Sequence, residues 1–140
     1  MTLNGLATFT IDGSGNLTFV DSDDQGNSYN DVWTDGNYIY IANPLGVMVY
    51  TESSGVLTYI GITDTVDSPA RIAGDGNYIF VMGGSSEWIK VYAVGGGGSL
   101  TLVQTIEESG SRFEGAYYYD GYLYVCVYEK GLYTYSVTTP

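Results

Sequence analysis

The sequence contains no histidine, and this absence removes several kinds of active site. Ser-His-Asp and Cys-His catalysis need an imidazole base, and many metal sites in proteins need histidine ligands. The single cysteine, Cys126, stands in an apolar run with no base near it in the sequence. We therefore predict no catalytic residue, no metal site and no cofactor, and we favour a protein that is not an enzyme.

A single cysteine also excludes a disulfide within the chain. Cys126 follows the turn Asp120-Gly121 at the same spacing at which Ile41 and Val81 follow two similar turns. Because both matching residues are apolar, we expect Cys126 to be a small buried side chain packed between sheets. It should then resist thiol reagents in the native state and react after denaturation.

Basic residues are scarce, with four Lys and Arg against sixteen Asp and Glu, and the net charge is -12. A polyanion would be repelled without any basic stripe to offset the repulsion, so nucleic acid and anionic membranes are disfavoured as partners. The acidity is typical of a soluble protein, and a cation or a neutral polar ligand is the alternative interpretation.

Long apolar runs are also missing. None approaches the roughly 20 residues that a membrane-spanning helix needs. The first five residues, Met-Thr-Leu-Asn-Gly, show neither the basic start nor the apolar core of a secretory signal. We therefore predict no membrane span and no signal peptide, and the compartment stays open.

Tyrosine and glycine are abundant, with 15 and 20 copies among 140 residues. Tyrosine packs well on a pleated surface and favours strands. Glycine adopts the positive φ angles of tight turns. With 44% hydrophobic residues the chain can bury a core, so the composition predicts an all-β domain with many short connections.

Three sequence signatures recur with one period. Asp-Gly turns at 35, 75 and 120 each precede an apolar run, and Leu-Thr pairs stand at 17, 57 and 100. A third signature ends in an aromatic residue, with steps of 41, 42 and 43 residues: Phe9, Tyr50, Tyr92 and Tyr135. Each period holds about four strand-sized runs, which is the pattern of a β-propeller blade. The runs after Asp-Gly are almost wholly apolar, as in strands buried on both faces.

We therefore predict a single domain, residues 1–140, made of three four-stranded blades. Blade one covers about 27–62, blade two about 68–107 and blade three about 112–137. Strands in 5–21 should complete blade three, in a partner chain, because propellers commonly close by joining strands from the two ends of the chain.

Three blades are too few for a ring, because propellers have four to about eight. Two copies give six blades, and twofold symmetry is the commonest closed arrangement. We therefore predict a homodimer. One strand of the third signature is surplus, either 5–11 or 131–137. It forms a fifth, outermost strand, or the chain is a piece of a longer array.

The runs 89–94 and 99–105, joined by a glycine-rich turn, resemble repeats of the seven-bladed lactonase-like propellers, the YVTN and phosphogluconolactonase-like group. Residues 47–59 and 6–19 are similar to the same unit. The resemblance implies a propeller fold, and it brings no catalytic residue of that group onto this sequence.

The starts of the innermost strands hold the candidate ligand residues, which are Tyr29, Asp31, Arg71, Arg112 and Glu114. Innermost strands lie nearest the ring axis, so polar groups at their starts converge at the mouth of a channel, as ligand sites require. Structural ion pairs across the axis are the alternative. Two acidic segments, 12–16 and 21–24, could bind a cation, but a hairpin turn and a solvated connection explain them better.

Three functions agree with these patterns. The first is a non-enzymatic homodimeric propeller that acts as a binding or scaffold module, with a neutral polar ligand such as a glycan or with a protein. The second is a structural or assembly subunit of a larger particle. The third is a degenerate lactonase-like hydrolase.

Overall fold

The computed structural model describes residues 5–26, 28–63, 68–84 and 87–138 of the chain. These residues form antiparallel β-sheets and one short 3-10 turn, Gly96–Gly98. The all-β prediction is therefore confirmed. Within the described ranges no helix is long and apolar enough to cross a membrane.

The strands form four sheets in chain order. The N-terminal sheet has two strands, β1 (Leu6–Ile11) and β2 (Leu17–Asp23). The first four-stranded sheet contains β3 (Asp31–Thr34), β4 (Ile39–Asn43), β5 (Gly46–Ser53) and β6 (Val56–Thr63). The second contains β7 (Pro69–Gly74), β8 (Tyr78–Gly83), β9 (Trp88–Val94) and β10 (Leu100–Glu107). The C-terminal sheet has three strands, β11 (Phe113–Tyr119), β12 (Tyr122–Val127) and β13 (Gly131–Ser136).

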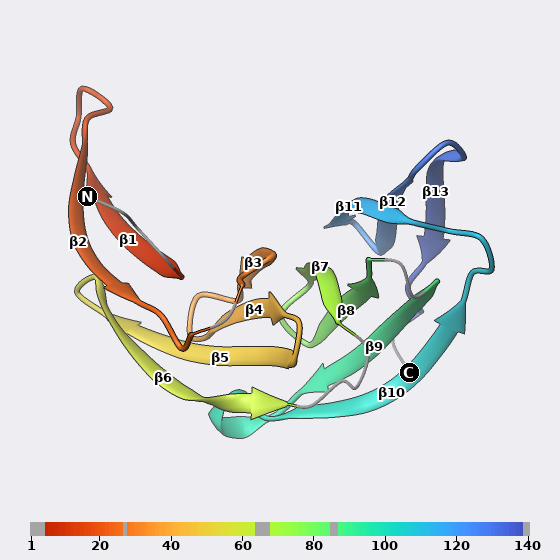
Figure 1. The fold of residues 1–140 in the computed structure, drawn as a ribbon, viewed down its shortest axis with the longest axis horizontal. Coiled ribbons are helices and arrows are strands. Elements are labelled where there is room, and N and C mark those ends of the chain that lie inside the picture. The colour runs from red at the N-terminus through yellow and green to blue at the C-terminus, as the bar shows by residue number, and fades with distance from the viewer. Residues whose placement is uncertain (1–4, 27, 64–67, 85–86, 139–140) are drawn as a thin grey trace.

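The sheets follow one another along an open arc (Figure 1). The first strand of each larger sheet lies on the concave side, and β6 and β10 lie on the convex side (Figure 1). Contacts between β3 and β7 and between β7 and β11 join neighbouring sheets at the concave side. Polar side chains from consecutive sheets can therefore lie close together on the concave side.

The apolar runs after the Asp-Gly turns become β4, β8 and β12, the second strand of each larger sheet. Tyr40 on β4 packs in one core with Ile79 on β8, and Phe80 on β8 packs in the next core with Leu123 on β12. Alternate residues of β8 thus face opposite neighbours, as side chains of a strand must. Fully burying one such side chain contributes about 1.5–3 kcal/mol, so these cores hold the arc together.

The predicted burial of Cys126 is wrong for this chain, because the side chain is exposed. In the first two turns Asp35 and Asp75 are the first residue of the turn, and each accepts a backbone N–H hydrogen bond from the third and fourth residues. In the last turn Tyr119 pairs with Tyr122, so Asp120 is the second residue, with φ 48°.

The same Asp-Gly pair therefore occupies different positions in the turn. Counted from this pair, β12 is shifted by one residue relative to β4 and β8. A shift of one residue moves every side chain to the other face. Val125 and Val127 lie in the core, and Cys126 between them faces outward, opposite Leu132 of β13.

The N-terminal sheet corresponds to the outer half of a four-stranded sheet. A bulge follows Thr8 in β1 and Val49 in β5, and the next aromatic residue pairs with an aromatic on the following strand in both cases. The ring pairs Phe9–Phe19 and Tyr50–Tyr59 have centroids 5.9 Å and 5.3 Å apart. β1 is thus equivalent to β5, and β2 to β6.

Candidate functional site

The starts of β7 and β11 on the concave side bring together three of the five predicted ligand residues. Nε of Arg112 lies 2.8 Å from Oε1 of Glu114, and Nη2 of Arg71 lies 3.7 Å from Oε2. Nε of Arg71 also donates to the Glu114 carbonyl at 2.6 Å. Glu114 therefore bridges two guanidinium groups from neighbouring sheets.

This cluster is partly open to solvent, since the three side chains are 30% to 65% exposed. Exposed ion pairs contribute only about 0–1 kcal/mol. The arrangement is therefore that of structural ion pairs, the alternative to ligand binding. The expected pairs crossed the ring axis, whereas these pairs join residues of one chain. A ligand would have to compete with bonds that the cluster already makes.

Asp31 lies at the start of β3 and binds backbone rather than the arginines. Its Oδ2 accepts a hydrogen bond from the Ile72 N–H at 3.1 Å, and its Oδ1 accepts one from the Val32 N–H at 3.0 Å. Nδ2 of the neighbouring Asn30 donates to the Pro69 carbonyl at 2.8 Å. These bonds tie β3 to β7, so Asp31 has a structural role on the concave side.

Tyr29 packs against a core cluster of the first four-stranded sheet, which contains Ile41, Met48, Tyr50 and Leu57. Its hydroxyl lies 2.6 Å from that of Tyr50 and accepts the Gln25 N–H at 3.1 Å. Burial, followed by the hydrogen bond with Tyr29, raises the pKa of Tyr50 well above the ordinary tyrosine value. Tyr29 therefore lies apart from the arginine cluster.

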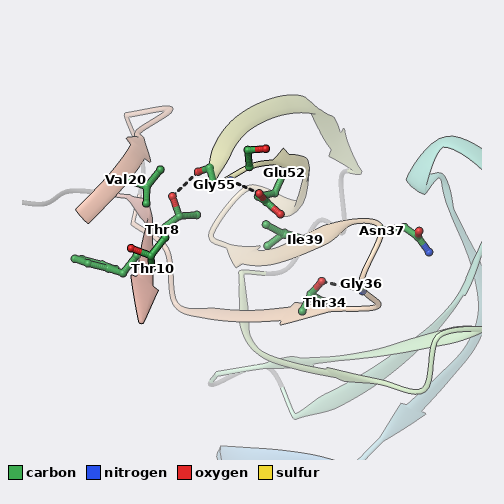
Figure 2. Close-up of a pocket in the computed structure, with 11 residues that line it drawn as sticks. Thr8, Thr10, Val20, Thr34, Gly36, Asn37, Ile39, Glu52 and Gly55 are labelled. Carbon is green, nitrogen blue, oxygen red and sulfur yellow. Dashed lines mark hydrogen bonds between the residues drawn. The ribbon is translucent and has the colours of Figure 1, made fainter. Parts of the chain in front are cut away.

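A groove runs beside the inner edge of β1, and sequence reasoning missed it. A cavity of about 690 Å³ is lined by Thr8–Thr10 of β1, by the β3–β4 turn and by the β5–β6 turn. A second cavity, of about 270 Å³, is lined by Gly5–Ala7 and by residues 29–32 with Ile41. We call the two together the β1 groove. Figure 2 shows the larger part, where Thr8 donates to the Gly55 carbonyl at 2.5 Å and Ile39 faces the space.

The two ends of the arc expose apolar faces. On the N-terminal sheet Phe9 pairs with Phe19 and Ile11 with Leu17, so all four share the face turned away from the first four-stranded sheet. Ile11 is 70% exposed. On the C-terminal sheet the outer face carries Tyr117, Tyr119, Tyr122, Cys126 and Leu132, and Tyr117 is 66% exposed. Each end face thus groups several exposed apolar or aromatic side chains on one side of its sheet.

The two acidic segments make hydrogen bonds within their own connections. Asp12 closes the β1–β2 hairpin, because its Oδ1 accepts hydrogen bonds from the N–H groups of Ser14 and Asn16 at 2.8 and 2.9 Å. The side-chain bond from Asn16 is the main reason that the pKa of Asp12 is lowered. Asp23 accepts a hydrogen bond from Gln25 at 2.7 Å. The described residues contain no group of three or more acidic or cysteine side chains that could hold a metal ion.

Comparison with known proteins gives no family for this chain, since no family model matches it and no curated protein does.

Proposed function

We propose that the chain is a non-enzymatic β-propeller module with three blades, which closes as a six-bladed ring with a second copy and serves as a binding or assembly scaffold. The observation that carries this proposal is the pair of exposed apolar faces at the ends of the arc. Equivalent faces between neighbouring sheets inside the arc are buried.

The strand count of the end sheets supports two copies. The N-terminal sheet has the two outer strands of a blade, and the C-terminal sheet has the inner three. Two joints between copies would each combine an N-terminal with a C-terminal sheet, and six blades lie within the range of known rings. The repeats that resemble lactonase-like propellers favour the same fold.

Assembly has more support than hydrolysis, because the chain has no histidine and the concave charges are already paired with each other. A ligand of the ring would lie at the concave mouth, beside Asp31, Arg71, Arg112 and Glu114 of both copies. A neutral polar molecule such as a glycan fits the net charge of -12, which would repel an anion. A glycan array separates such a ligand from a purely structural role.

Light scattering during size-exclusion chromatography tests the ring. We expect a mass near twice 15.1 kDa. Each joint would bury apolar faces, so the midpoint of thermal unfolding should rise with protein concentration. A stable monomer at all concentrations, or a trimer, would contradict the proposal.

A further inference from the structure

β1 presents the edge that β13 uses to bind β12. Leu6-Ala7-Thr8-Phe9 matches Leu132-Tyr133-Thr134-Tyr135, and each run follows a glycine with positive φ, 79° at Gly5 and 99° at Gly131. β13 pairs with β12 through its inner edge. Among the described residues β1 pairs only with β2, and it uses the edge through which β5 pairs with β6. The opposite, inner edge of β1 therefore has no partner strand there.

The β1 groove is where the inner half of a blade would lie. Elsewhere in the arc this place, beside the inner strands of the next sheet, is filled by the inner strands of the preceding sheet: Phe80 and Met82 of β8 pack against Leu123 and Val125 of β12. In the β1 groove no described strands take the place of β7 and β8, and Val32, which lines the groove, is 51% exposed.

We propose that the β1 groove receives the β11–β12 hairpin of a second copy, whose β12 pairs with β1. This inference rests on the proposed ring and specifies its joint. The exposed tyrosines of the hairpin, Tyr117, Tyr119 and Tyr122, fill the groove against β3 and β4. The shared blade then consists of β11 and β12 from one copy and β1 and β2 from the other.

The charges at the two surfaces are complementary. The equivalence of β1 with β13 places Val127 of one copy opposite Gly5 of the other. At that end of the hairpin lie Arg112, whose carbonyl binds the Tyr128 N–H at 2.9 Å, and Lys130 in the β12–β13 turn. Beside Gly5 lie Asp23 and Asp24, and Asp31 lines the same end of the groove. In this joint two of the four basic residues, which within the chain bind Glu114, Ser109 and Ser111, would lie near acidic residues of the other copy, and this attraction would orient the hairpin.

The joint also gives the surplus strand a place. β13 and the partner's β1 use the same edge of β12, so they cannot bind together. In the ring β13 yields that edge to β1, whose Phe9 and Phe19 replace Tyr135 and its neighbours against the second four-stranded sheet.

Disulfide trapping with Cys126 tests this register. The pairing puts Leu6 of one copy opposite Cys126 of the other, as Leu132 stands opposite Cys126 within the chain. Opposite residues of antiparallel strands have Cα atoms about 4.5–5.5 Å apart, within the range that a disulfide spans. Mild oxidation of Leu6→Cys should therefore give a covalent dimer on a denaturing gel.

Ala7→Cys is the matched control, because its side chain points to the opposite face of the same strand. We expect it to form covalent dimer at least about tenfold more slowly than Leu6→Cys, since the thiols cannot meet. If the two variants cross-link equally, or if neither does while light scattering shows a dimer, this joint is wrong and the proposed ring stands. If the unmodified protein is a monomer, both proposals fail.

Leu132→Cys tests the displacement of β13. Its disulfide with Cys126 forms within one chain and locks β13 in place, so the oxidised variant should dimerise at least about tenfold more weakly than the reduced one. Equal dimerisation of both forms would overturn the exchange. Should Leu6→Cys not fold, the triple variant Thr8→Cys, Tyr124→Cys, Cys126→Ser moves the cross-link two residues along each strand, to the next pair on the same face, and should also give a covalent dimer.

Discussion

Phe80 on β8 and Tyr124 on β12 occupy equivalent places in their sheets once the one-residue shift of β12 is counted, but they lie in opposite surroundings. Phe80 on β8 is 2% exposed, stacks on Tyr118 with ring centroids 5.8 Å apart and belongs to the core between two sheets. Tyr124 on β12 is half-buried, at the outer face of the last sheet. Both places carry a large aromatic residue, whereas burial depends on whether another sheet packs against that face. Apolar character at this place in a sheet therefore does not by itself report burial, since no described sheet packs against the outer face of the last sheet.

Replacing each residue by alanine should sharpen this comparison most. Phe80→Ala leaves a cavity in a closed core and should lower the free energy of unfolding by about 3–5 kcal/mol. Tyr124→Ala should change the unfolding of the monomer far less and weaken the proposed dimer instead. Urea denaturation at low concentration and light scattering separate the two effects. Equal losses of unfolding free energy would show that the outer face is already buried.

The turns allow a second comparison between repeats. Asp35→Ala removes a carboxylate that accepts two backbone N–H bonds, and we expect a loss of about 1–2 kcal/mol in the free energy of unfolding. Asp120→Gly should be neutral or slightly stabilising, because residue 120 has a φ of 48° that glycine adopts without strain. Denaturant titration of both variants measures the difference. A loss at Asp120 as large as that at Asp35 would contradict the assigned turn register.

Thiol labelling compares the outer face of β12 in the single chain and in the proposed ring. Cys126 is exposed in the single chain, so a thiol reagent should react with it rapidly at low protein concentration. At concentrations that favour the dimer the joint covers β12, and the rate should fall in proportion to the remaining monomer. A rate that does not change while the mass doubles would place the joint elsewhere.

High pH should destabilise the first four-stranded sheet through Tyr50. Its pKa is raised in the folded chain, mainly by burial, so the stability it contributes is fully present below pH about 10. That stability is lost as the pH rises above this value, because only the unfolded chain then ionises freely. Tyr50→Phe should weaken the dependence of the unfolding midpoint on pH between about 10 and 11. The same slope in both proteins would exclude this residue as the cause.

The smallest effect is expected at the concave cluster. Arg71→Ala removes a partly exposed ion pair and should change the free energy of unfolding by about 0–1 kcal/mol. Arg112→Ala is the matched change on the other side of Glu114. If either variant loses several kcal/mol, the cluster holds the arc together, and its use as a ligand site becomes untenable.

The repeat predicted the strands and the double burial of β4 and β8, because period and apolar runs report local structure. It could not give the register of β12, since the letters Asp-Gly are compatible with two positions in a turn. Asp31 is held by the Ile72 N–H of the neighbouring sheet, and Tyr29 is held by Tyr50 and by the Gln25 N–H, and the repeat spacing reports neither contact. The β1 groove arises from strands that the N-terminal sheet lacks, and the only signal for it was the surplus strand at 5–11 or 131–137.

The two end faces of the arc are different surfaces, so copies that join through them meet head to tail. Such a contact closes only if the rotation from one copy to the next brings the last free end back to the first. Any other rotation leaves a free β1 edge and a free hairpin at the ends of a growing polymer. A substitution that tilts one sheet against the next, at Ala73 for example, should thus convert the proposed ring into a fibre without altering a residue of the joint.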